Sequence, residues 1–213
     1  MTVRRVLWYV VLVWTTSVSC GSVDDSLVGM VRDEPLVVSD VTVTDVTSDG
    51  AYRDHDGLFT MTAEPGRLLV VYFGYTNCPD LCPTTMAALR GARADLGDDG
   101  DRFDVAMVTV DPERDRPEVL NGYLAGFGEL FHALRPVSAD ELLAVEAAFL
   151  ASSTVTTGPD GEVEVGHSAT TYVVDEGGRV LVEWPFGVTK DGMANDLRIL
   201  LRETEKQTGR ETP

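Results

Sequence analysis

Apolar residues along the chain form nearly continuous runs that alternate with segments in which they recur at helical spacing. The runs RLLVVYFGY at residues 67–75 and RFDVAMVTVD at residues 102–111 contain few polar side chains. Continuous apolar runs of this length are typical of strands that are buried on both faces of a sheet. Between them, residues 83–97 place Met86 and Leu89 at helical spacing, which predicts a helix.

Two further helices are predicted after the second strand. Residues 116–127 form the first, and Pro117 suits its opening turn because a first-turn residue needs no backbone N–H donor. Residues 138–150 form the second. Ser138 is its expected N-cap, and Glu141 three residues later completes the pattern of a capping box.

The last third of the chain returns to strands and ends in a helix. Residues 157–166, TGPDGEVEVG, predict a polar loop or hairpin tip, and residues 170–184 predict a β-hairpin that turns at 176–178. A final helix is expected over residues 189–204, followed by a flexible tail at 205–213.

The order of these elements predicts the fold class. Strands that alternate with helices pair in parallel, and the late hairpin adds an antiparallel pair. This α/β order is that of a thioredoxin-like sheet. Residues 36–46 are rich in Val and Thr, and a short strand is expected after a turn at Asp56–Gly57. Together they predict an N-terminal β-hairpin as an addition to the main domain, which spans residues 36–204.

The first residues have the pattern of an export signal over residues 1–19. Arg4 and Arg5 precede the apolar stretch 6–14, and small residues follow it. The stretch is too short to cross a bilayer comfortably, which takes about 20 apolar residues. We expect a cleaved or lipid-anchored signal, with an uncleaved anchor as the alternative.

Cys20 follows this apolar stretch, at the place where bacterial lipoproteins carry the cysteine that is acylated. Ser17 occupies the position where such proteins usually have Leu, so simple cleavage stays open as an alternative. A lipid on Cys20 predicts an exported protein held at the outer face of the cytoplasmic membrane, with residues 20–35 as a tether.

Composition limits the functions that remain. Of the 213 residues, 44% are hydrophobic, which is enough for one full core. The formal net charge is −18. Because nucleic-acid binding needs clustered Lys and Arg, we expect no nucleic-acid partner.

Cys78 and Cys82 stand in the predicted turn between the first buried strand and its helix, in YFGYTNCPDLCP. Spacing of i, i+4 places both sulfurs on one face of a helical turn. Unpaired N–H groups at a helix start favour the thiolate, which is both the better nucleophile and the better metal ligand. The pair is therefore a structural disulfide, a redox pair or part of a metal site.

The residues themselves leave these three possibilities open. A disulfide across so short a loop stabilises the fold little, because it constrains the unfolded chain little. Thioredoxin-type catalysts have two residues between their cysteines, where this chain has three. Such catalysts also usually place a cis-proline opposite the thiols, and no proline occurs here between Pro159 and Pro185.

A metal site needs a further ligand, and the candidate is His167, just before the strand expected from Thr170. Thiolate ligands select Cu(I), and imidazole suits copper as well as zinc. Zinc prefers four ligands in a closed structural site. His55 and His132 are interpreted as ordinary surface or hydrogen-bonded histidines.

Three segments in order resemble the Sco/SenC family of copper-binding, thioredoxin-like assembly proteins. They are VYFGYTNCPDLCPTTM, VTVDPERDRPEVLNGY and GHSATTYVVDEGGRV, and the resemblance covers roughly residues 36–201. It implies a thioredoxin-like fold and a copper site, for Cu(I) and Cu(II), made of Cys78, Cys82 and His167. Asp111 in VDPERD is expected to support that site or to contact a partner, with a plain turn-forming role as the alternative.

The resemblance also implies a function. The protein would deliver copper to the CuA centre of the copper-binding subunit of cytochrome c oxidase, with coupled thiol–disulfide chemistry, and would be a metallochaperone more than an enzyme. The alternatives are a thiol–disulfide oxidoreductase or peroxidase without a metal, a redox sensor, and a zinc-stabilised domain.

Overall fold

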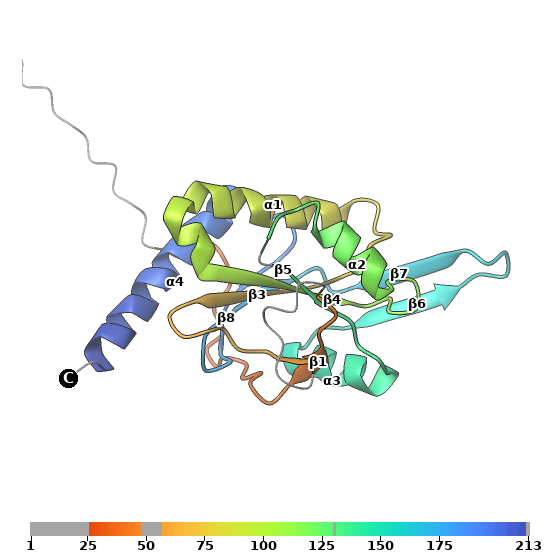
Figure 1. Cartoon of the computed structure of the whole chain (residues 1–213), viewed down its shortest axis with the longest axis horizontal. Helices are drawn as coiled ribbons and strands as arrows, with labels where there is room; N and C mark the ends of the chain where they lie inside the picture. Colours follow the sequence, from red (N-terminus) through yellow and green to blue (C-terminus); the bar gives the residue numbers. More distant parts are fainter. Residues whose placement is uncertain (1–25, 48–56, 130, 212–213) are drawn as a thin grey trace, which may run out of the picture.

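A five-stranded sheet lies at the centre of the computed structural model, which describes residues 26–47, 57–129 and 131–211 (Figure 1). Its strand order is β5-β4-β3-β8-β9. The strands are β3 (Leu68–Gly74), β4 (Phe103–Thr109), β5 (Phe131–Leu134), β8 (Thr171–Val174) and β9 (Val180–Trp184). β3, β4 and β5 are parallel, and β8 and β9 run antiparallel to their neighbours. The predicted thioredoxin-like α/β order is confirmed.

The two apolar runs form the middle of this sheet. All seven residues of β3 and all seven of β4 are buried. Their register runs from Leu68 opposite Phe103 to Gly74 opposite Thr109, so both strands end at the same edge. Sites in open α/β sheets form at this carboxyl edge, and the loop with the two cysteines leaves β3 there.

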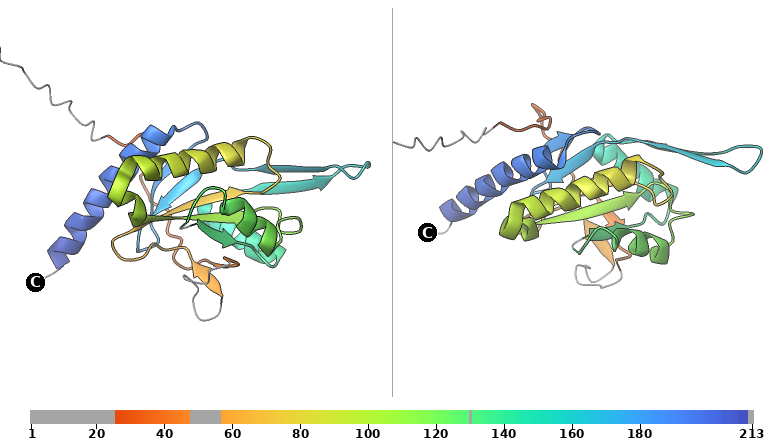
Figure 2. Two further views of the ribbon diagram at one scale, coloured as in Figure 1. Left: turned by 45° about the horizontal axis from the view of Figure 1, so that its top comes forward. Right: turned by 90° about the horizontal axis from the view of Figure 1, so that it is seen from above.

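Helices cover both faces of the sheet. α1 (Leu81–Leu96) and α4 (Lys190–Glu211) lie together on one face, and α3 (Ala139–Phe149) lies on the other (Figures 1 and 2). The helix α2 (Pro117–Leu124) packs beside β5, and a short 3-10 turn, η1 (Gly97–Arg102), follows α1. The predicted helices are thus all present, and Pro117 opens α2 as expected.

The start of α3 confirms one half of the predicted capping box. The Ser138 hydroxyl accepts a hydrogen bond from the Glu141 backbone N–H. The Glu141 carboxylate, in contrast, accepts from the N–H groups of Val137 and Thr44. Because Thr44 belongs to the N-terminal hairpin, this carboxylate ties α3 to another element as well as to the residue before its own N-cap.

Three strands, β5, β6 (Ser153–Thr157) and β7 (Val163–His167), were absent from the sequence-based expectation. β5 is only four residues long, and so short an apolar run carries no clear period. The segment expected as a loop or hairpin tip is the end of a longer hairpin, β6 with β7, which projects from the body (Figure 2). Its strands are mostly exposed, so they lack the apolar pattern of a buried strand.

The N-terminal addition is present as predicted. β1 (Thr42–Thr44) pairs antiparallel with β2 (Leu58–Thr60). Gly57, at the end of the expected turn, has φ 77°, a conformation that glycine adopts without strain. Backbone bonds from Val46 to Ala133 and from Arg135 to Thr44 attach this region to the outer edge of β5.

The expected tether at residues 20–35 is wrong over the part that the structure describes. Met30 forms a bridge with Glu183 on the outer edge of β9, with N–H···O distances of 2.8 Å in both directions. The backbone N–H groups of Val28 and Gly29 donate to the buried carboxylate of Asp196 at 2.8 and 2.9 Å. A buried carboxylate requires donors, and this segment supplies them, so the folded domain starts before residue 36.

The predicted helix end at residue 204 is also wrong, because α4 continues to Glu211. The added residues are mainly Glu, Lys, Gln and Arg, which are good helix formers. An ion pair between Arg102 and Glu205, 2.5 Å, holds the start of this extension against η1. The tail predicted over 205–213 is therefore helical as far as Glu211.

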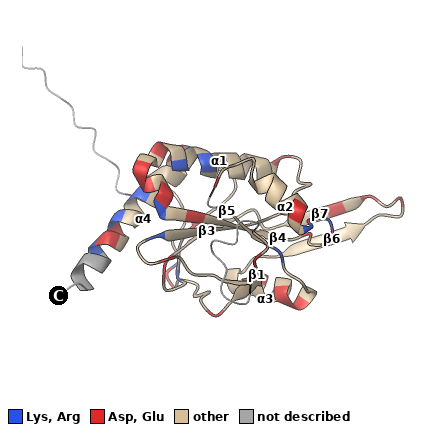
Figure 3. Cartoon of the chain, viewed as in Figure 1, with Lys and Arg blue, Asp and Glu red and all other residues tan. Residues whose placement is uncertain are grey.

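The predicted export signal, Cys20 and His55 lie outside the described residues. Within the described part of the chain, no helix is both long enough and apolar enough to cross a membrane. Acidic side chains are spread over α1, α2, α3 and the β6–β7 hairpin (Figure 3), as the net charge of −18 leads one to expect.

Candidate metal centre

Cys78 and Cys82 are brought together by the turn from β3 into α1. Cys78 lies in the loop, and its N–H donates to the Tyr75 carbonyl at 3.3 Å. Cys82 is the second residue of α1, and its N–H donates to the Cys78 sulfur at 3.3 Å. The first sulfur thus accepts from one of the backbone donors that a helix start leaves without a partner.

His167 reaches the cysteines from a segment that lies 85 positions after Cys82 in the sequence. It ends β7, where it pairs with Ser153 at the base of the projecting hairpin. Its Nδ1 lies 2.9 Å from the Ser168 carbonyl oxygen. Because a carbonyl only accepts, Nδ1 carries the proton, and Nε2 presents its lone pair toward the Cys82 sulfur at 3.7 Å. A metal-ligating histidine is oriented in this way.

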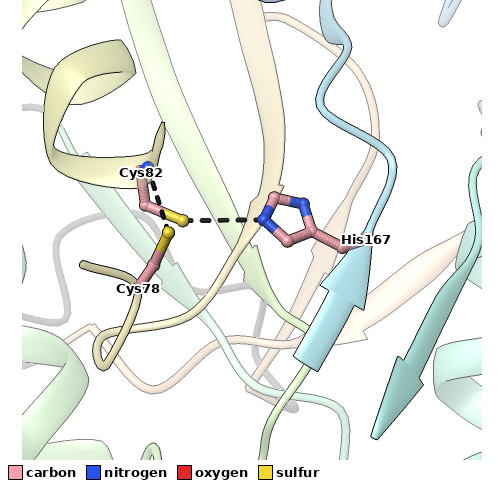
Figure 4. Close-up of side chains that lie close together, drawn as sticks. All are labelled: Cys78, Cys82 and His167. Atoms are coloured by element: carbon pink, nitrogen blue, oxygen red, sulfur yellow. Dashed lines mark hydrogen bonds between the residues drawn. The ribbon is translucent and has the colours of Figure 1, made fainter. Parts of the chain in front are cut away.

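The three side chains form one compact group (Figure 4). Cys78 Sγ, Cys82 Sγ and one His167 ring nitrogen all lie within 4.8 Å of one another. Cys82 is fully buried, Cys78 is 9% exposed and His167 is partly exposed. The group is therefore closed on the side of α1 and open on the side of the hairpin.

The two thiols have different acidities. Burial raises the pKa of the Cys82 thiol to about 12, and the neighbouring Cys78 adds to this rise. Burial also acts to raise the pKa of Cys78, but hydrogen bonds from the Cys82 side chain and from backbone N–H groups at the start of α1 outweigh it. The net pKa of Cys78 lies below its ordinary value, so Cys78 is the more readily ionised sulfur.

Aromatic rings hold the histidine against the cysteines. Tyr72 and Tyr75 both meet the His167 ring edge-on, with centroids at 6.1 and 5.8 Å. Gly74 lies between them: a Cβ there would stand 2.6 Å from Tyr72 Cε1 and 3.1 Å from Cys82 Sγ. The absence of a side chain at Gly74 leaves the space that the Cys82 sulfur needs.

Asp115 is a residue of the site that the sequence did not single out. Its carboxylate is fully buried and accepts from the Thr76 N–H at 3.0 Å, the Thr76 hydroxyl at 2.5 Å and the Thr109 hydroxyl at 2.6 Å. It fixes the loop two residues before Cys78. The available signal was the last aspartate of VDPERD, but only the fold shows that it faces the cysteine loop.

Asp111 does not join the cysteine–histidine group. Its carboxylate pairs with Arg114, and its carbonyl accepts from the N–H groups of Arg114 and Asp115. The Arg114 guanidinium lies 5.9 Å from the centroid of the Tyr75 ring, which itself contacts His167. These contacts show the turn-forming role; support of the site through Arg114 or a partner contact stays a prediction.

His132 is a buried packing residue outside the site. It lies in β5, is 2% exposed, and its ring stands 4.6 Å from that of Phe59. It does not belong to the cysteine–histidine group.

The protein has a thioredoxin-like sheet with two cysteines at the start of its first helix, and a histidine from an inserted hairpin faces them. These features define a class of thioredoxin-like proteins whose thiol site suits a metal. The chain belongs to the SCO1/SenC family, whose sequence profile matches residues 45–202.

Curated relatives are similar over the main domain. The SCO2-like protein of Rickettsia prowazekii is 30% identical over 136 residues, which are 60% of this chain and 63% of that protein. A putative copper-binding protein of Stutzerimonas stutzeri is 29% identical over 125 residues, 58% of this chain and 61% of that protein. The match thus spans less than two thirds of the length of these two relatives.

Solved structures show the same fold. ScoI of Bradyrhizobium japonicum, solved with copper bound, has a TM-score of 0.61 and 26% identity, and the match covers 78% of this chain and 96% of that one. The apo Sco1 protein of Thermus thermophilus has a TM-score of 0.62 and 28% identity, covering 85% of this chain and 97% of that one.

Proposed function

We propose that this protein binds copper through Cys78, Cys82 and His167. The observation that carries the proposal is the convergence of two sulfurs and one ring nitrogen within 4.8 Å. Two thiolates and an imidazole are ligands that suit Cu(I), and the imidazole also suits Cu(II). The copper-bound structure of the Bradyrhizobium relative and the putative copper-binding protein of Stutzerimonas support this choice of metal.

We further propose that the protein hands its copper to the CuA centre of cytochrome c oxidase at the outer face of the cytoplasmic membrane, held there by a lipid on Cys20. BsSco, a structural neighbour, is a member of the Sco family of cytochrome c oxidase assembly proteins. A SCO1/SenC family lipoprotein from Bacillus anthracis has the same fold. The partly exposed His167 leaves one side of the site accessible, so an incoming ligand can take the metal by exchange.

A second candidate function is thiol–disulfide exchange with a partner. The lowered pKa of Cys78 and the raised pKa of Cys82 favour it, because an exchange reaction needs one attacking sulfur and one resolving sulfur. Cys78 would attack a partner's disulfide and release one partner thiol. Cys82 would then displace the second, so the partner gains two electrons as Cys78 and Cys82 form a disulfide. This reaction and copper binding exclude each other at one site.

Copper titration tests the proposed function. The reduced protein is titrated with Cu(I) without oxygen against a competing chelator, and one tight copper per chain is expected. Cys78→Ser or Cys82→Ser should abolish tight binding, and His167→Ala should weaken it, most visibly for Cu(II). Thr156→Ala, an exposed change on the same hairpin, is the control and should bind as the wild type does. Absence of tight binding by the wild type would leave the thiol–disulfide function in its place.

A further inference from the structure

Tyr72 has a buried hydroxyl that is poorly satisfied. The residue is 0% exposed in the middle of the sheet. Its hydroxyl oxygen is buried, and no hydrogen bond of ordinary length and angle joins it to a residue that the structure describes. Leaving a buried donor without an acceptor is costly, so the few that folded proteins retain call for an explanation.

The hydroxyl lies beside the Cys82 sulfur. The Tyr72 ring and Cys82 Sγ approach the same point above Gly74, at 2.6 and 3.1 Å from the position of a Cβ there. The same ring meets His167 edge-on. Cys82 and Thr85, one turn apart on α1, are the side chains within weak hydrogen-bonding reach of the hydroxyl. This poorly satisfied donor is therefore located at the candidate metal site itself.

The charge state of the sulfur decides how strongly this donor is bound. A protonated thiol is a weak acceptor, whereas a metal-bound sulfur is a thiolate and accepts strongly. The pKa of Tyr72 lies above its usual range, first because the ring is buried and then because of the charge on Cys82. The hydroxyl thus keeps its proton when Cys82 is ionised.

We propose that Tyr72 is a positioning residue of the copper site, whose hydroxyl donates a stronger hydrogen bond to the Cys82 sulfur in the copper-bound protein than to the thiol of the metal-free form. This inference rests on the proposed copper binding by Cys78, Cys82 and His167. The Tyr72 hydroxyl is then poorly hydrogen-bonded without copper and well hydrogen-bonded with it. Part of the copper affinity therefore comes from a residue that does not touch the metal.

The test replaces the hydroxyl alone. Tyr72→Phe keeps the ring that packs on His167 and removes the donor. The expected result is an affinity for Cu(I) about tenfold lower than that of the wild type, the value of one hydrogen bond to a charged group. The sulfur-to-Cu(II) charge-transfer band should move to lower energy, since the Cys82 sulfur loses a stabilising donor.

The melting temperature of the metal-free protein distinguishes this positioning role from a structural one. Because the hydroxyl has no well-formed hydrogen bond to lose there, Tyr72→Phe should leave the melting temperature unchanged or raise it. A hydroxyl that served packing or a bond to Thr85 would instead lower the melting temperature when removed. Tyr172→Phe is the matched control, since Tyr172 is a buried tyrosine of the neighbouring strand that packs on Phe73 and Phe149.

The outcomes are distinct. Weaker Cu(I) binding and a shifted band in Tyr72→Phe, with neither change in Tyr172→Phe, support the proposal. Wild-type affinity and an unshifted band in Tyr72→Phe overturn it and leave copper binding standing. A wild-type protein that binds no copper overturns both, because no metal-bound sulfur then exists to accept the bond.

Discussion

Cys78 and Cys82 show how one helical turn gives two identical side chains different chemistry. Cys82 points into the core and has no contact with water, whereas Cys78 stays 9% exposed and accepts the helix N–H. Desolvation disfavours the thiolate of Cys82, and hydrogen bonding favours that of Cys78. Ionisation and solvent access therefore both make Cys78 the more reactive of the two sulfurs.

The first residue-scale prediction is that Cys78 is alkylated much faster than Cys82 in the reduced, metal-free protein. With a pKa of about 12, only about one Cys82 in ten thousand is a thiolate at pH 8. We expect iodoacetamide to modify Cys78 more than about tenfold faster. As pH rises, the rate at Cys78 should level off at a lower pH than for a free cysteine. Peptide mass spectrometry of timed samples measures both sites, and equal rates would contradict the assigned environments.

At the scale of single elements, the end of β3 and the start of α1 together form the site. The strand supplies Tyr72 and Gly74, the helix supplies Cys82, and Asp115 anchors the loop between them through Thr76. Each element is recognisable from its own pattern. The close contact between them depends on a residue without a side chain at the last position of the strand.

The element-scale prediction is that Gly74→Ala destabilises the protein by about 1–3 kcal/mol, the usual cost of overpacking a core. The new methyl group would meet Tyr72 and Cys82 at 2.6 and 3.1 Å, so the ring and the sulfur must move apart. Copper affinity should fall as well. Urea unfolding of the metal-free protein measures the first effect.

Gly122→Ala is the control for this change. Gly122 lies inside α2, and a Cβ there would meet nothing within 4 Å. Alanine is the better helix former, so this variant should be as stable as the wild type or up to about 1 kcal/mol more stable. Gly74→Ala behaving like Gly122→Ala would refute the crowding at the strand end.

At the scale of the whole molecule, segments outside the thioredoxin-like core close both edges of the sheet. Residues 30–38 bond to β9 and its turn on one side, and residues 44–47 bond to β5 on the other. Exposed sheet edges are templates for unwanted pairing, and these segments cover them. Asp196 on α4 holds the first of them, since it accepts from Val28, Gly29 and the Trp184 indole.

The molecule-scale prediction is that Asp196→Ala releases the N-terminal segment. Three donors lose a buried acceptor, each at a cost of about 1–3 kcal/mol where no water replaces it. We expect a lower melting temperature and a loss of hydrogen-exchange protection at the Val28, Gly29 and Met30 amides. Protection that persists at these amides would show that the segment is held by other contacts.

The local pattern of apolar residues predicted the elements that are long and buried. β3, β4, α1, α3 and the β8–β9 hairpin were all predicted, because each presents a full period of apolar residues. β5, β6 and β7 were missed, the first because it is short and the other two because they are exposed. The helix end at 204 and the tether at 20–35 were wrong because distant partners, Arg102 and Asp196, determine where those segments stay ordered.

The sequence alone established the order of the helices and of the long, buried strands, the cysteine pair at a helix start and, through the family resemblance, His167 as its partner. Only the tertiary structure shows that His167 reaches Cys82 across 85 positions of the chain, that Asp115 fixes the loop and that the buried Tyr72 hydroxyl is poorly satisfied. The physical reason is the distance along the sequence over which each feature is encoded. Periodicity and helix starts are encoded by neighbouring residues, whereas the environment of a buried polar group depends on segments that meet only when the chain folds.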